Sequence, residues 1–206
     1  MKRTFVVLLT LMAFTALPML AQEKEKPKEA APSMEPPKPL ADDFCKWMIG
    51  EWEGWSTSPM GKSKDWQKVE MGLDKQFVMT HYNSKMTEMT PDQMKAMAEA
   101  YGMTKEQVEK MKDMTYKGMG PMTINPMTGE YVGYWFDNWR GMYKGTGKRE
   151  GNKITMNWEG PMGTSMRTIE NVGDDKMVQT YSEKDMKGNV VEGKTEMTRK
   201  KMTMKK

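Results

Sequence analysis

The sequence predicts an all-β fold, a closed antiparallel barrel of about ten strands. From Glu51 onwards, apolar and polar residues alternate with a period of two, as in half-buried strands. Short connections rich in Gly, Asn and Asp separate these segments, and such hairpins force neighbouring strands to run antiparallel. A sheet of this many twisted strands tends to curl, so closure into a barrel is expected.

The alternating segments define the predicted strands individually. They cover Glu51–Thr57, Lys64–Leu73, Gln76–Lys85, Thr115–Ile124, Glu130–Asp137, Gly141–Arg149, Lys153–Glu159, Thr164–Glu170, Lys176–Glu183 and Val190–Arg199. The clearest turns are 125–129, 150–152, 173–175 and 187–189, whose residues tolerate positive φ. Glycines within the strands, at Gly118, Gly133, Gly145 and Gly193, are expected at the bends that closure requires.

Two regions outside the strands have helical spacing. Apolar residues in 40–49 predict a short helix, with Asp42 and Asp43 in its first turn. A two-helix insertion is predicted at 90–113. Its first helix begins with a capping box at Thr90 and ends before Gly102, and Thr104 begins the second. At a barrel rim this insertion would act as a lid or simply as packing over one end.

The N-terminal 39 residues predict export. Residues 1–21 have a signal peptide pattern, with Lys2 and Arg3 before an apolar run from Phe5 to Leu20. Residues 22–39, rich in Pro, Lys and Glu, are expected to be a disordered tether to the 40–199 barrel domain, and 200–206 is a basic tail. We therefore expect a periplasmic or extracellular protein with no stable membrane span after leader cleavage.

Composition narrows the classes of function. The chain has 32 basic and 28 acidic residues, a net charge of +4; without Lys2 and Arg3 the charge is +2, which predicts no nucleic-acid partner. The 27 Met residues among 37% hydrophobic residues predict a core filled by flexible thioethers. Cu(I) binding by Met pairs such as Met94/Met97 is the alternative explanation.

The sequence contains no recognisable catalytic constellation. One His and one Cys exclude the common zinc clusters, and phosphate-binding or dinucleotide-binding glycine motifs are absent. Cys45 is predicted to be a small buried hydrophobe. His81 has two interpretations, a hydrogen-bonded structural residue or a pocket residue that could serve as an axial haem ligand. We predict no catalytic residue, no metal and no resident cofactor.

The opening stretch Gly50-Glu51-Trp52-Glu53-Gly54, after a short helix, resembles the start of calycin barrels, the group that includes lipocalins. The run Gly129–Val132, followed by Tyr134–Asp137, and the ending Met197–Arg199 resemble more closely a bacterial domain-of-unknown-function family, DUF1579. The resemblance implies that Trp52 stacks on a basic side chain of the last strand. That residue is Arg199, with Arg167 as the alternative partner.

A closed barrel either fills with side chains or encloses a ligand. The leading hypothesis is therefore a non-catalytic carrier or sensor for a small apolar ligand; the alternative is a cell-envelope protein-interaction module with a filled barrel and an unidentified partner. Strand alternation offers seven lining residues for the first hypothesis: Phe77, Met79, His81, Trp135, Met156, Trp158 and Tyr181. Trp52 and Arg199 are assigned to structure, and Trp55 should point to the opposite face from Trp52.

Overall fold

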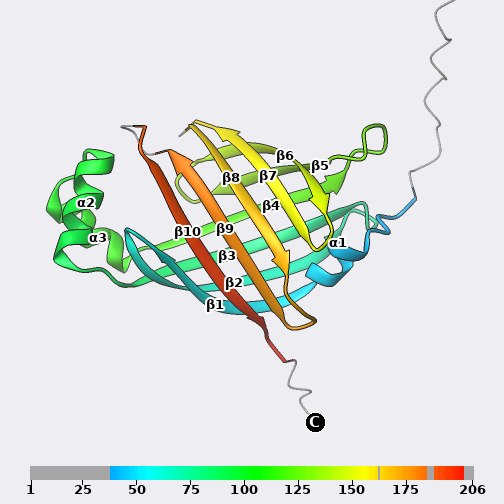
Figure 1. Cartoon of the computed structure of the whole chain (residues 1–206), viewed down its shortest axis with the longest axis horizontal. Coiled ribbons are helices and arrows are strands. Elements are labelled where there is room, and N and C mark those ends of the chain that lie inside the picture. The colour runs from blue at the N-terminus through cyan, green and yellow to red at the C-terminus, as the bar shows by residue number, and fades with distance from the viewer. Residues whose placement is uncertain (1–37, 162, 185–187, 202–206) are drawn as a thin grey trace, which may run out of the picture. The chain divides into compact units, whose positions relative to one another are not determined.

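The chain forms a closed antiparallel barrel of ten strands in a computed structural model that describes residues 38–161, 163–184 and 188–201 (Figure 1). β1 pairs with β2 on one side and β10 on the other, so the sheet has no open edge. The strands are β1 (Gly50–Ser58), β2 (Gly61–Gly72), β3 (Phe77–Glu88), β4 (Thr115–Ile124), β5 (Tyr131–Asp137), β6 (Met142–Glu150), β7 (Lys153–Gly160), β8 (Gly163–Asn171), β9 (Lys176–Lys184) and β10 (Val190–Arg199). The predicted fold class is confirmed. The predicted leader, and the tether and tail except at their barrel-proximal ends, lie outside the described residues.

A short helix, α1 (Asp43–Met48), closes one end of the barrel. Asp42 caps it, because its side chain accepts a hydrogen bond of 2.7 Å from the Cys45 backbone N–H. Arg149, from β6, donates to both Asp42 and Asp43 and so connects the helix to the wall.

The two-helix insertion lies at the opposite end from α1 (Figure 1). Both α2 (Pro91–Tyr101) and α3 (Lys105–Asp113) begin with the predicted capping boxes, and Gly102 ends α2 in the left-handed conformation. Met94, Met97 and Val108 are buried between them, with Met60 of the β1–β2 turn packed alongside. None of the helices in the described part of the chain is long and apolar enough to cross a membrane.

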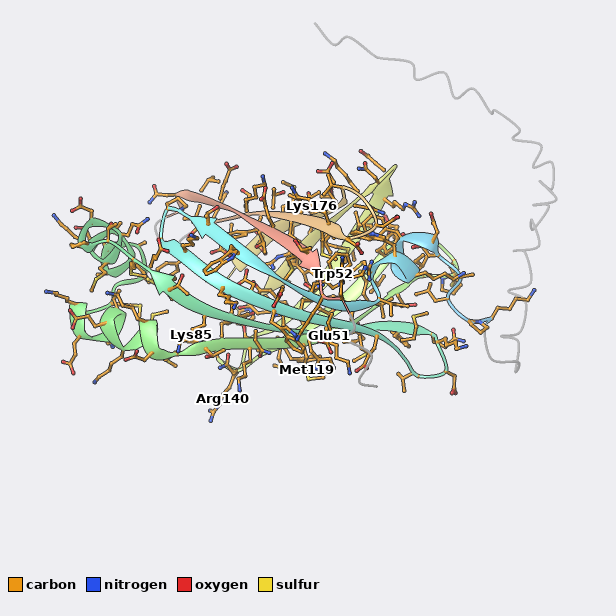
Figure 2. The ribbon with its side chains drawn as sticks, turned by 90° about the horizontal axis from the view of Figure 1, so that it is seen from below. Glu51, Trp52, Lys85, Met119, Arg140 and Lys176 are labelled. Atoms are coloured by element: carbon orange, nitrogen blue, oxygen red, sulfur yellow. The ribbon has the colours of Figure 1, made fainter. Side chains whose placement is uncertain are left out.

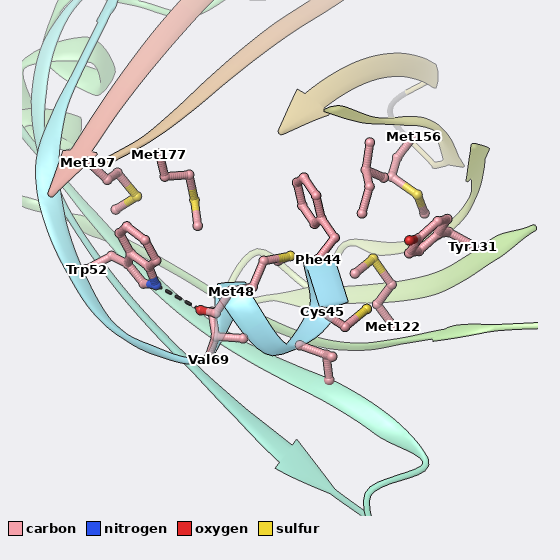
Figure 3. Packing of buried hydrophobic residues seen from close by; sticks show 12 residues of the cluster. Phe44, Cys45, Met48, Trp52, Val69, Met122, Tyr131, Met156, Met177 and Met197 are labelled. Atoms are coloured by element: carbon pink, nitrogen blue, oxygen red, sulfur yellow. Dashed lines mark hydrogen bonds between the residues drawn. The ribbon is translucent and has the colours of Figure 1, made fainter. Parts of the chain in front are cut away.

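The end of the barrel that α1 closes is filled with side chains, and we call this region the base. Trp52 is fully buried there, and its indole N–H donates a hydrogen bond of 2.8 Å to the Met48 carbonyl (Figure 3). Phe44, Met48, Met156, Met177 and Met197 belong to the same buried core, which places methionine in the role of core filler. Cys45 is fully buried among them, as predicted.

Arg199 covers Trp52 from outside the base, as the calycin resemblance implied. Its Cζ lies 4.1 Å from the indole centroid, and its guanidinium donates to the carbonyls of Ile49 at 2.5 Å and Trp47 at 2.7 Å. Trp55, by contrast, is 44% exposed on the outer face. Lys176 and Arg140 mark two opposite sides of the barrel's outer surface (Figure 2).

Candidate functional site

The inner face of β3 differs from the one we expected. Cα partners place Thr80 opposite Val69 and Tyr82 opposite Gln67, and both β2 residues are buried. The lumen therefore receives Val78, Thr80, Tyr82 and Ser84. Phe77, Met79 and His81 lie on the outer face, so their predicted lumen position was wrong. Hydrophobic alternation could not decide which face of β3 points into the lumen, because both faces carry aromatic and apolar residues.

The other four predicted lining residues point inward. Met156 belongs to the base, where it is 1% exposed. Trp135, Trp158 and Tyr181 lie in the other half of the barrel, which we call the upper lumen, and each keeps some accessible surface. The structure adds three inward-facing aromatic residues of the upper lumen that sequence analysis missed: Tyr82, Tyr116 and Tyr143.

Glycines on neighbouring strands let these rings lie against the wall. A Cβ built on Gly118 would lie 2.3 Å from the Trp135 ring, and one on Gly145 would lie 2.7 Å from the Trp158 ring. Gly193 receives Tyr181 in the same way. The predicted role of these glycines as bends is therefore incomplete, because they are also seats that accommodate aromatic rings from neighbouring strands.

The β1–β2 side of the upper lumen is polar. Asp65 is 1% exposed, accepting a hydrogen bond from the Ser56 hydroxyl and one of 3.0 Å from the Ser63 hydroxyl. Thr195 of β10 lies 2.5 Å from Ser56 through its hydroxyl and continues the network. This buried carboxylate is thus satisfied mainly by hydroxyl groups.

Two glutamines separate the upper lumen from the base. The Gln179 side chain donates a hydrogen bond of 2.9 Å from Nε2 to the side-chain amide oxygen Oε1 of Gln67. The same amide nitrogen lies 3.2 Å and 3.7 Å from the sulfurs of Met177 and Met197, which belong to the base core. Below this pair the barrel interior is apolar, and above it the interior is aromatic and polar.

Arg167 of β8 is the main cation of the upper lumen. Its register partners are Met156 and Tyr181, both inward-facing, so Arg167 also points inward. Its guanidinium lies 5.6 Å from the Tyr181 ring centroid, within the range of a cation–π contact. It forms no hydrogen bond or ion pair with any residue that the structure describes. Five donor N–H groups are therefore available to a bound group.

A second donor in the upper lumen lacks a partner. The indole nitrogen of Trp158 is buried, yet no acceptor within the described residues reaches it. A buried N–H without an acceptor costs free energy that a ligand's oxygen atom could recover. Trp135 differs, because its N–H donates to the Tyr116 hydroxyl at 2.8 Å.

Burial keeps the lumen phenols neutral. Burial raises the pKa of Tyr116 to about 12 and raises that of Tyr181 above its usual value. The pKa of Tyr82 is raised by burial first and by the Asp65 charge second, while the Arg167 charge acts in the opposite direction on the same hydroxyl. The site can therefore offer neutral hydroxyl donors beside the positive charge of Arg167 and the carboxylates of Asp65, Asp137 and Glu183.

The helical insertion borders the mouth of the upper lumen. The Tyr101 hydroxyl, at the end of α2, donates to Glu183 of β9 at 3.4 Å. Two depressions of about 400 Å³ and 470 Å³ also lie on the barrel, but most of their lining residues face outward from β6–β10 and β1. Neither is the upper lumen.

Residues that might act as a nucleophile and a base are far apart in the fold. Cys45 is in the base, where burial raises the pKa of its thiol well above the usual range. His81 is on the outer face, 3.6 Å from a Glu70 oxygen. Within residues 38–201, as far as they are described, no three His, Cys, Asp or Glu side chains gather to hold a metal ion.

Solved structures of other proteins share this barrel. No family model matches the chain, and no curated protein matches its sequence. The S-type phycobiliprotein lyase CPES from Guillardia theta superposes with a TM-score of 0.53 and 8% identity, over 81% of this chain and 96% of that one. Rv2717c from M. tuberculosis gives a TM-score of 0.52 and 10% identity, over 78% and 99%. At these identities the likeness establishes a common lipocalin-like barrel fold.

Proposed function

We propose that the protein is a non-catalytic binding protein that holds a small, flat ligand carrying an anionic group in the upper lumen. The unpartnered guanidinium of Arg167 is the observation that carries the proposal. A charged group without a direct ion pair in a partly buried site is costly, and a bound carboxylate or sulfonate would offset that cost. The sequence-based expectation of an apolar ligand is thereby narrowed to an amphipathic one.

The shape of the site supports the flat part of the ligand. Trp135, Trp158 and Tyr181 lie on glycine seats, so ring faces line the wall. Aromatic walls favour planar, unsaturated molecules that stack or meet them edge to face. Trp158 adds one hydrogen-bond donor that no acceptor among the described residues reaches. Export and membership of family DUF1579 remain part of the same proposal, resting on the leader pattern and the three sequence motifs.

Two dyes with the same aromatic skeleton test the proposal. Anilinonaphthalene sulfonate is anionic, and N-phenylnaphthylamine is its neutral counterpart. We expect Arg167→Gln to weaken binding of the anionic dye by roughly 10- to 100-fold, which corresponds to the loss of a charge-assisted hydrogen bond. Binding of the neutral dye should be nearly unchanged. Fluorescence titration measures both affinities.

Arg140→Gln is the matched control, because Arg140 is exposed on the outer surface. Equal loss in both variants would place the dye on the surface and contradict the lumen site. Equal affinity of wild-type protein for both dyes, with no change in Arg167→Gln, would reject the anionic group. A small molecule that co-purifies with the protein from its own cells, detected by native mass spectrometry, would identify the natural ligand.

A further inference from the structure

The outer surface of β4, β5 and β6 carries exposed apolar residues in one row. Met119 pairs with Phe136, and Phe136 pairs with Met142, so the three side chains lie on adjacent strands of the same face. They are 43%, 43% and 66% exposed. Tyr134 and Trp139, 45% and 50% exposed, belong to the same two-strand unit, β5–β6. A contiguous patch of this kind is typical of an interaction surface.

Cations without partners surround the row. Five exposed basic side chains of β2–β6 form no ion pair with any described residue: Lys64, Lys85, Lys117, Arg140 and Lys144. Lys85, Met119 and Arg140 lie along one side of the molecule (Figure 2). Acidic residues nearby are few. Glu70 is paired with Lys68 and His81, Glu88 is paired with Lys62, and Glu159 faces Lys144 across β6–β7.

The β5–β6 turn holds Trp139 and Arg140 in a fixed conformation. Asp137 accepts backbone hydrogen bonds from Trp139 at 2.9 Å and Gly141 at 2.8 Å. The Asn138 side chain donates to the Thr115 carbonyl at 3.0 Å, which fastens the turn to β4. Arg140 has a φ of 64°, where Gly or Asn would fit at lower cost. A strained arginine beside an exposed tryptophan favours a role for the two side chains.

We infer that this aromatic–basic face, made of the five apolar residues and the five cations above, docks the protein on an anionic lipid surface. Trp and Tyr prefer the membrane–water interface, and each Lys or Arg near an anionic bilayer adds to the attraction. The charges complement lipid phosphates, and the Met119–Phe136–Met142 row gives an apolar centre that a polyanion would not require. The inference is independent of the upper lumen, since every residue of the aromatic–basic face lies on the outer surface of the barrel.

Sedimentation of the full chain with phosphatidylcholine vesicles, with and without phosphatidylglycerol, tests the inference. We expect binding to the anionic vesicles only. Arg140→Glu should weaken it roughly tenfold or more, and Trp139→Ser should weaken it by a similar factor. Lys176→Glu is the matched control, because this cation is on another side of the barrel (Figure 2) and should change little.

Any lipid binding by the N-terminal residues would be the same in all variants. A second measurement therefore locates the contact with the lipid. Lipids brominated on their acyl chains should quench the tryptophan emission of the wild-type protein more than that of Trp139→Phe, which retains binding. The lipid assignment is overturned if anionic vesicles do not bind, if Lys176→Glu is as weak as Arg140→Glu, or if quenching is the same in Trp139→Phe. Binding to dextran sulfate that equals vesicle binding and ignores Trp139→Ser would assign the face to an acidic polymer instead.

Discussion

The two halves of the barrel interior use the same wall differently. In the base, Trp52 is fully buried and its N–H has an acceptor, while Arg199 outside it donates to two carbonyls. In the upper lumen, Trp158 has a buried N–H without an acceptor, and Arg167 has no polar partner among the described residues. The same residue types are thus satisfied at one end and unsatisfied at the other. Satisfied groups stabilise the fold, and unsatisfied groups are available to a ligand.

The largest expected effect is in the base. Trp52→Ala should lower the free energy of unfolding by about 3–5 kcal/mol, because it removes a large side chain from a filled core and leaves a cavity. Arg199→Ala should cost less, about 2 kcal/mol, through loss of its charged hydrogen bonds and its contact with the indole. Urea denaturation of both variants measures the difference.

Trp55→Ala provides the control for removal of an indole, since Trp55 is exposed on the same strand and should change stability by less than about 0.5 kcal/mol. If Arg199→Ala were as destabilising as Trp52→Ala, the guanidinium and not the buried indole would be the main stabilising group of the base.

An intermediate effect is expected where the glycine seats support the upper lumen. Gly145→Ala would place a Cβ within 2.7 Å of the Trp158 ring, which must then move toward the lumen. We expect a loss of about 1–3 kcal/mol in stability from overpacking. We also expect weaker binding of both naphthalene dyes, since the displaced ring occupies their space. Urea denaturation and dye titration measure the two effects.

Thr146→Ala, on the outer face of the same strand, should change neither quantity appreciably. A Gly145→Ala variant with lower stability but unchanged affinity for both dyes would mean that the ligand does not lie against Trp158.

The contrast between the halves also explains how much the sequence could predict. All ten strands and all three helices of the described residues were predicted, because turn residues and capping boxes are local signals. The contact of Trp52 with Arg199 in the base was predicted from the resemblance of the Trp52 motif to calycin barrels. The upper lumen was predicted only in part. Trp135, Trp158 and Tyr181 were predicted to point inward, but polar inward residues such as Ser63 and Asp65 hide the alternation on which the prediction depends.

Arg167 shows what information was missing. The sequence predicts only an alternative partner role toward Trp52 for this residue, because no sequence signal tells an inward arginine from an outward one. Its position between inward-facing Met156 and Tyr181 becomes clear only from the strand register. The misplacement of His81 has the same origin, since the register of β3 with β2 decides which face it occupies.

The smallest expected effect concerns the clamp between α1 and β6 at the base. The hydrogen bond from Arg149 lowers the pKa of Asp43 from 3.8 to about 2. A carboxyl whose pKa is lower in the folded state stabilises that state when ionised. Its contribution is therefore complete above pH 3.8 and is lost as the pH falls toward 2. Asp43→Asn should lower the urea midpoint slightly at neutral pH, and this difference from wild type should disappear in that acidic range. Asp113→Asn, at the end of α3, is the control, and a difference from wild type that persists unchanged at acidic pH would mean that Asp43 acts through packing and not through its charge.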